Sequence, residues 1–168
     1  QSAEYFVVSL ENPVGATLGT NTVSTVYIID NDKPAPTPTN QISLNYIGSF
    51  DPSGNSTSST EIVVHDAATQ RLFTISSLTD VFDIINFSNP LSPSVITTVN
   101  MLPYGGITSI AVKNGIVAVA SPNGTNPQGN GSVVFFDTNG VFLKQVNVGV
   151  LPDMITFTPD GTKGLTAN

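Results

Sequence analysis

The chain has 168 residues, of which only 10% are charged, and a net charge of -7 with just five Lys and Arg residues. Nucleic-acid and anionic-membrane surfaces need clustered basic side chains, so this balance excludes both as partners. The absence of Cys excludes disulfides and thiolate chemistry, and no apolar run approaches the roughly 18 residues that span a bilayer, so we expect a soluble segment.

Residues 4–32 alternate apolar and polar side chains with the period of two that is typical of strands. The side chains on one side of the first predicted strand are Phe6, Val8 and Leu10. A turn containing Pro and Gly follows, and Val23–Ile29 is the second predicted strand. Two strands alone bury no core, so we predict that this region is part of a larger β structure.

These residues resemble the C-terminal hairpin of a Calx-beta domain, an immunoglobulin-like sandwich. The resemblance rests on EYFVVSLENPVGATLG at residues 4–19 and on the closing triplet Asp30-Asn31-Asp32. In Calx-beta domains that bind calcium, the acid that opens this pattern and the closing triplet contribute ligands. The resemblance therefore implies a Ca2+ site at Glu4, Asp30, Asn31 and Asp32, with further ligands upstream, because Ca2+ prefers oxygen donors. The alternative is a solvated, turn-forming triplet without metal.

Residues 33–40 contain three prolines at alternate positions, Pro34, Pro36 and Pro38. Such a run favours extended polyproline geometry and cannot join the interior of a sheet. We therefore predict a semi-rigid linker at 33–40, the end of a Calx-beta-like sandwich at 1–32, and a separate β domain at 41–168.

Short apolar runs recur about every ten residues after the linker, with turn signals between them. The first run is Ile42–Phe50. The next eight form two sets of four: Ile62–His65, Leu72–Ile75, Val81–Phe87 and Val95–Val99, then Ile107–Val112, Ile116–Ala120, Val133–Asp137 and Phe142–Val148. A third set begins at Met154. The sets recur at intervals of roughly 45 to 48 residues, which suits four-stranded propeller blades.

The fold class predicted from these patterns is all-β. It comprises the end of an immunoglobulin-like Calx-beta sandwich and about two to three four-stranded antiparallel β-propeller blades. Asn114-Gly115 and Asn139-Gly140 are hairpin signals within the second blade. No window of about ten residues has capped helical periodicity, so we expect almost no helix.

Residues 42–168 resemble the start of the β-propeller in bacterial choice-of-anchor I proteins. The resemblance is carried by EIVVHD at 61–66, TQRLF at 69–73, IAVKNGIVAV at 110–119, VFFD at 134–137 and LPDMITFTPDG at 151–161. The family usually reads VLVAN where this chain has GLTAN at 164–168, so its last strand is slightly atypical. Members are large exported proteins, many labelled alkaline phosphatase-like and some with Calx-beta modules. The resemblance implies that further blades lie outside these 168 residues.

Five polar residues of the blade region are candidates for chemistry. His65 and Asp66 are adjacent, but consecutive strand residues point to opposite faces, so we predict a structural His65 and a turn at Asp66 rather than a ligand or a catalytic pair. Glu61 and Asp153 precede the first strands of successive blades, near the end where propeller sites usually converge, so they are candidates to line a central channel. Asp160, within Pro-Asp-Gly, is expected to shape a turn.

The low charge content, against about 25% in typical domains, and the abundance of Ser, Thr, Asn, Gly and Pro favour a secreted β-rich protein. We expect a segment of an extracellular or cell-surface protein that acts in attachment or assembly, without catalytic or cofactor-binding residues. Open sheet edges predict pairing with the remainder of its own chain or with other copies, as a homo-oligomer or filament. The alternative, suggested only by the labels of the resembling family, is part of an extracellular phosphoester hydrolase whose active site lies largely outside this segment.

Overall fold

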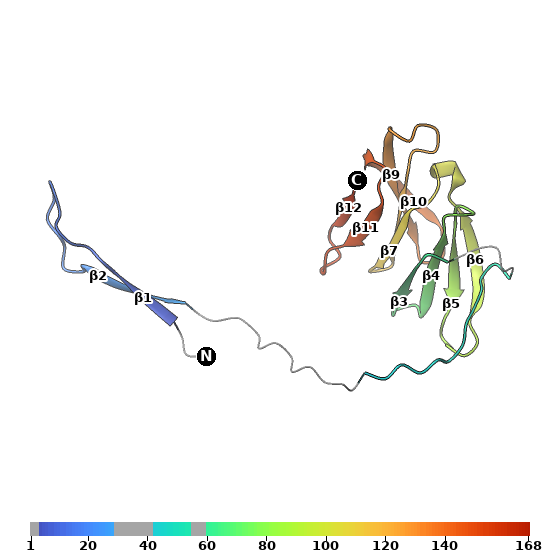
Figure 1. The fold of residues 1–168 in the computed structure, drawn as a ribbon, viewed down its shortest axis with the longest axis horizontal. Coiled ribbons are helices and arrows are strands. Elements are labelled where there is room, and N and C mark those ends of the chain that lie inside the picture. The colour runs from blue at the N-terminus through green and yellow to red at the C-terminus, as the bar shows by residue number, and fades with distance from the viewer. Residues whose placement is uncertain (1–3, 29–41, 55–59) are drawn as a thin grey trace. The chain divides into compact units, whose positions relative to one another are not determined.

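Strands make up 49% of the residues that the computed structural model describes, which are 4–28, 42–54 and 60–168 (Figure 1). Helical structure within these residues is limited to a three-residue 3-10 turn, η1 (Leu102–Tyr104). No described helix has the length and apolarity needed to cross a membrane. The all-β fold is therefore confirmed. The chain splits into two units, Gln1–Leu44 and Asn45–Asn168.

In the first unit the described residues form one antiparallel hairpin. Strand β1 (Glu4–Ser9) pairs with β2 (Val23–Ile28), from Glu4 opposite Ile28 to Ser9 opposite Val23. Every residue of both strands is exposed, and the rings of Tyr5 and Tyr27 lie 5.8 Å apart across the ladder. The hairpin thus forms at the predicted positions but buries no core among its described residues. The predicted linker at 33–40 lies outside the described residues.

The described residues of the second unit form two four-stranded antiparallel sheets and a two-stranded one. In sheets 1 and 2 the strands follow one another in chain order, as in a meander, and sheet 3 is a hairpin. Sheet 1 contains β3 (Ile62–Asp66), β4 (Arg71–Ser76), β5 (Val81–Asn86) and β6 (Ser94–Asn100). Sheet 2 contains β7 (Ser109–Lys113), β8 (Ile116–Ser121), β9 (Asn130–Asp137) and β10 (Phe142–Val150). Sheet 3 contains β11 (Met154–Phe157) and β12 (Gly164–Ala167).

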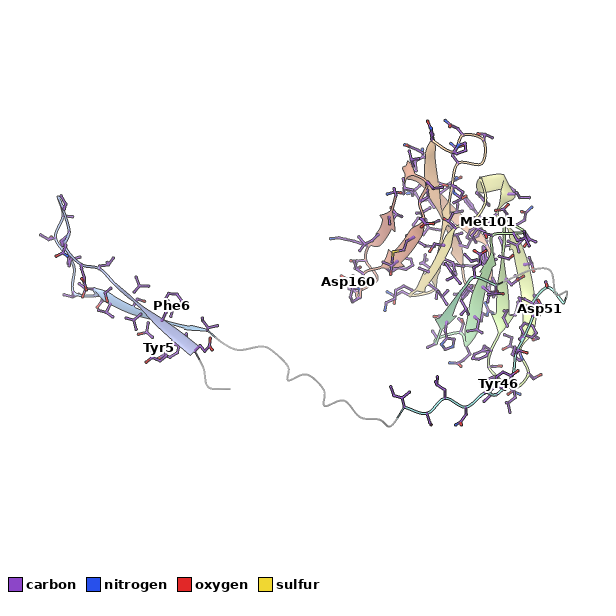
Figure 2. The ribbon with its side chains drawn as sticks, in the orientation of Figure 1. Tyr5, Phe6, Tyr46, Asp51, Met101 and Asp160 are labelled. Carbon is purple, nitrogen blue, oxygen red and sulfur yellow. The ribbon has the colours of Figure 1, made fainter. Side chains whose placement is uncertain are left out.

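The strand predicted at Ile42–Phe50 does not form. Residues 42–54 carry no strand, and Tyr46, labelled in Figure 2, is 84% exposed. Apolar alternation makes a strand only where a neighbouring strand accepts its hydrogen bonds, and no described strand pairs with this segment. Ile47 and Phe50 instead line a cavity of about 320 Å3 against Leu72 and Ile85 of sheet 1.

The three sheets stack, and each buries its apolar side chains against the next. Phe73, Phe82 and Ile84 of sheet 1 and Val134 and Phe136 of sheet 2 belong to one fully buried cluster. A second cluster joins the other face of sheet 2 to sheet 3 and contains Ala118, Ala120, Val133 and Ile155. The first strands of the sheets are neighbours, because β3 and β11 both contact β7 (Figure 1). This is the packing of successive β-propeller blades, and burying each Phe stabilises it by about 1.5–3 kcal/mol.

Both predicted hairpins of sheet 2 form, with different turns. Asn114 and Gly115 have φ values of 50° and 78°, which is the backbone of a type I′ turn. At the second hairpin only Gly140 has a positive φ, of 83°, and its N–H donates to the carbonyl of Asp137 at 3.0 Å. The Asp137 carboxylate also accepts the N–H groups of Asn139 and Val141, each at 2.8 Å, so a side chain closes this wider turn.

Candidate functional site

A polar cavity of about 550 Å3 lies at one end of the stacked sheets, between sheet 2 and the loops beside it. Figure 1 shows η1 and the loop from β8 to β9 at the same end of the sheets. We call this cavity the interblade cleft. Its polar lining residues include Asp80, Tyr104, Asn123, Ser132, Gln145 and Asn147.

The cleft begins where one face of sheet 2 changes from apolar to polar. Alternate residues of a strand share a face, so on β9 the buried Phe136 and Val134 are followed on the same side by Ser132. On β10, Gln145 lies opposite Val134 and donates its side-chain N–H to the Ser132 hydroxyl at 2.8 Å. Asn147 lies opposite Ser132. Aromatic and aliphatic side chains fill the space between sheets 1 and 2 farther from this end. At this end, amides and hydroxyls line it instead.

Two loops form a wall of the cleft by direct backbone contact. Gly105 has a φ of 117°, and a Cβ on it would lie 2.1 Å from the carbonyl oxygen of Pro122. A Cβ on Gly124 would lie 2.9 Å from the Cα of Gly105. The buried Ser121 donates its hydroxyl proton to the Gly106 carbonyl at 2.7 Å. Only glycine fits at Gly105 for two reasons. A residue with a side chain disfavours this φ value, and its Cβ would clash with backbone atoms of the neighbouring loop.

Asp80 contributes to the cleft from sheet 1. It ends the turn between β4 and β5 with a φ of 50°, a region that Asp and Asn tolerate better than most residues. Its carbonyl accepts the N–H of Met101 at 2.8 Å, and its carboxylate oxygen Oδ1 accepts the N–H of Ile107 at 3.3 Å. These bonds hold the carboxylate against the loop that joins the two sheets. Among the described residues that line the cleft, Asp80 is the one charged side chain.

The cleft residues are not predicted by any pattern in the sequence. From the sequence, Asp80 is expected to be an ordinary turn residue, and Gln145 and Asn147 are expected to lie on the solvent face of an outer strand. No motif joins them, because the cleft is created by the stacking of one sheet on the next.

The predicted calcium ligands are only partly within the described residues. Glu4 is exposed and pairs with Ile28 at the end of the hairpin, while Asp30, Asn31 and Asp32 lie outside the described residues. Within ranges 4–28, 42–54 and 60–168, no three or more His, Cys, Asp or Glu side chains gather in a group that could hold a metal. The Ca2+ site therefore stays a prediction.

The structure separates the His65-Asp66 pair, as expected. His65 is exposed at the start of sheet 1, and its ring meets Phe87 edge-on at 6.1 Å. The carboxylate of Asp66 accepts the backbone N–H of Thr69 at 3.1 Å and its hydroxyl at 2.5 Å. Asp66 therefore shapes the turn into β4 rather than orienting the imidazole.

The other acids lie outside the cleft. Glu61 is exposed and accepts the hydroxyl proton of Ser77, and Asp153 is exposed just before β11. Asp160, at the tip of the β11–β12 hairpin (Figure 2), accepts the Thr158 hydroxyl at 2.5 Å and the Thr162 N–H at 3.0 Å. The Thr158 hydroxyl contributes most to holding the pKa of the Asp160 carboxyl below its ordinary value. Asp160 thus shapes a turn, as predicted.

Comparison with known proteins assigns the blade region to a family. Residues 61–168, which span sheets 1 to 3, match the choice-of-anchor I domain. No curated protein matches the chain significantly. The match covers well over half of the chain, and it begins one residue before β3. The chain therefore belongs to the choice-of-anchor I family.

Proposed function

We propose that this chain is a non-catalytic segment of a modular bacterial surface protein that acts in attachment or assembly through β-sheet packing. Its parts are the end of a Calx-beta sandwich at 1–32, a Pro-rich linker at 33–40 and propeller blades at 41–168. The family assignment is consistent with a surface-associated protein, at the cell surface or outside the cell.

The observation that carries this proposal is that sheet 3 has exposed apolar residues, and that no strand among the described residues pairs with the outer edge of β12. Sheets 1 and 2 each have four strands, whereas sheet 3 has two, with β12 at its edge. Met154 is 50% exposed and Leu165 is 53% exposed. Open edges and apolar residues of this kind pair with further strands, here from the same protein or from other copies.

The register of sheet 3 identifies the backbone groups that are free to pair. Thr158 donates its N–H to the carbonyl of Lys163 at 2.9 Å, so these two residues form a hydrogen-bonded pair. Such pairs alternate along an antiparallel ladder, and Thr166 therefore lies in a non-hydrogen-bonded position opposite Ile155. The N–H of Thr166 points away from β11, toward the open edge.

Thr166→Pro tests strand pairing at this edge. Proline removes an N–H that the ladder with β11 does not use, so sheet 3 keeps its hydrogen bonds while the edge loses a donor. We expect concentration-dependent oligomers of the wild-type chain in size-exclusion chromatography with light scattering, and a shift toward monomer in Thr166→Pro. Thr166→Val keeps the N–H and serves as the matched control. A wild-type chain that stays monomeric at every concentration would contradict the proposal.

A phosphatase assay addresses the rival function. We expect the purified segment to release no phosphate from p-nitrophenyl phosphate, with or without added divalent metal. If the segment hydrolyses this substrate and a chelator abolishes the hydrolysis, the assembly role is wrong and the segment is part of a phosphoester hydrolase.

A further inference from the structure

The interblade cleft has the size of a small-molecule site and a mainly polar lining. Its volume of about 550 Å3 lies inside the roughly 300–1,000 Å3 usual for such sites. Most of its polar lining is uncharged, from Asn, Gln, Ser, Thr and Tyr side chains, and the described residues that line it include no Lys, Arg or His. An occupant of this cleft must therefore satisfy neutral donors and acceptors together with one carboxylate.

Asp80, Gln145 and Asn147, which all line the cleft, have side-chain hydrogen-bonding groups that no described residue uses. Oδ1 of Asp80 is occupied by Ile107, and no described residue donates to Oδ2. The Gln145 amide donates to Ser132 through its nitrogen, and none of the described residues donates to its carbonyl oxygen. The side chain of Asn147 has no hydrogen bond to any described residue and offers both a donor and an acceptor. Amides and carboxylates of this kind pair with neighbouring hydroxyl groups.

The cleft also has a limited apolar surface. Leu102, Pro103 and Pro122 line it beside the polar groups. A sugar ring presents hydroxyls around its rim and C–H groups on its faces, so this combination of amides and aliphatic rings suits it. A wholly apolar ligand would remove water from the amides and the carboxylate and leave them without partners, which opposes its binding.

Other ligand classes fit less well. An anion would face the Asp80 carboxylate with no cation in the described lining to offset the repulsion. A Ca2+ ion takes six to eight oxygen ligands and favours several carboxylates, whereas the cleft offers one. The backbone contact between Gly105 and Pro122 holds the walls before any ligand arrives, so little ordering opposes binding.

We propose that the interblade cleft binds a neutral saccharide, with Asp80, Gln145 and Asn147 as the hydrogen-bonding residues and Leu102 and Pro122 beneath the sugar ring. The site lies between adjacent blades, at one end of the sheets. It needs no partner copy, so it does not depend on the assembly role.

The test uses the purified chain on an array of neutral oligosaccharides: α-glucans, β-glucans, mannans, galactans and N-acetylglucosamine oligomers. The best binder is then titrated by calorimetry against Gln145→Ala, Asn147→Ala and Asp80→Asn. Gln145 and Asn147 are exposed, so their variants are expected to fold as the wild type does. Asn tolerates the backbone of Asp80, so the third variant changes charge with little strain. Each variant should weaken binding about tenfold, the equivalent of one hydrogen bond.

Lys144→Ala is the matched control. Lys144 lies on the same strand as Gln145, but opposite Phe135, and so on the other face of sheet 2; its variant should bind like the wild type. The proposal is overturned if no oligosaccharide on the array binds, or if binding survives the Gln145→Ala/Asn147→Ala double variant. Binding of spermidine or choline in place of the sugars, or an equal loss in Lys144→Ala, would overturn it too. If the protein is monomeric and still binds sugar, the saccharide site is supported and the assembly proposal is contradicted.

Discussion

Phe136→Ala removes the aromatic ring at the centre of the interface between sheets 1 and 2. Phe136 is 1% exposed, and its ring centroid lies 5.2 Å from that of Phe82 in sheet 1 and 5.9 Å from that of Tyr104 in η1. Deleting a buried Phe side chain typically destabilises a protein by about 3–5 kcal/mol, and the contacts on both sides place this site near the upper value. Because the free energy of unfolding of a domain is typically about 5–15 kcal/mol, this loss is a large share of it.

Urea denaturation followed by circular dichroism measures this loss. With an m-value of about 2 kcal/mol per molar, a loss of about 4 kcal/mol lowers the midpoint by roughly 2 M. Phe142→Ala is the control, because Phe142 is 47% exposed and its removal should cost only about 1–1.5 kcal/mol. A double-mutant cycle of Phe82→Ala with Phe136→Ala should give a coupling energy of about 0.5–3 kcal/mol. Equal losses in Phe136→Ala and Phe142→Ala, or additive effects of the Phe82 and Phe136 changes, would show that the sheets do not share one core.

The remaining predictions concern the loop contact, a turn carboxylate and the hairpin. Gly105→Ala should lower the melting temperature far more than Gly54→Ala, since both need a positive φ but only Gly105 is crowded, by the carbonyl of Pro122; equal shifts would contradict the backbone contact. The Asp160 carboxyl should titrate by NMR below its unfolded value of about 3.9, so the stability of its turn is complete above that pH and is lost as pH falls through the lower folded pKa, a dependence that Asp160→Asn removes. Calorimetry should detect Ca2+ binding that EGTA reverses and Glu4→Gln weakens at least tenfold; heat unchanged by the Glu4 substitution would argue for the metal-free turn.

Much of the fold is readable in the sequence because the signals are local. Short apolar runs separated by turn signals predicted every strand from β3 to β10 within a few residues. Asn114-Gly115 predicted its turn, because the φ values of both residues are set by steric limits within the turn itself. The roles of Asp66 and Asp160 follow for the same reason, since their hydrogen-bond partners lie two or three residues away.

Long-range contacts decide the rest. Ile42–Phe50 has the alternation of a strand but forms none, because pairing depends on which backbone groups a neighbouring sheet still offers. Asp80 and Gln145 belong to different sheets and line one cleft only because sheet 1 stacks on sheet 2. Side chains so far apart in the chain meet through packing geometry, which alternation along a single strand does not encode.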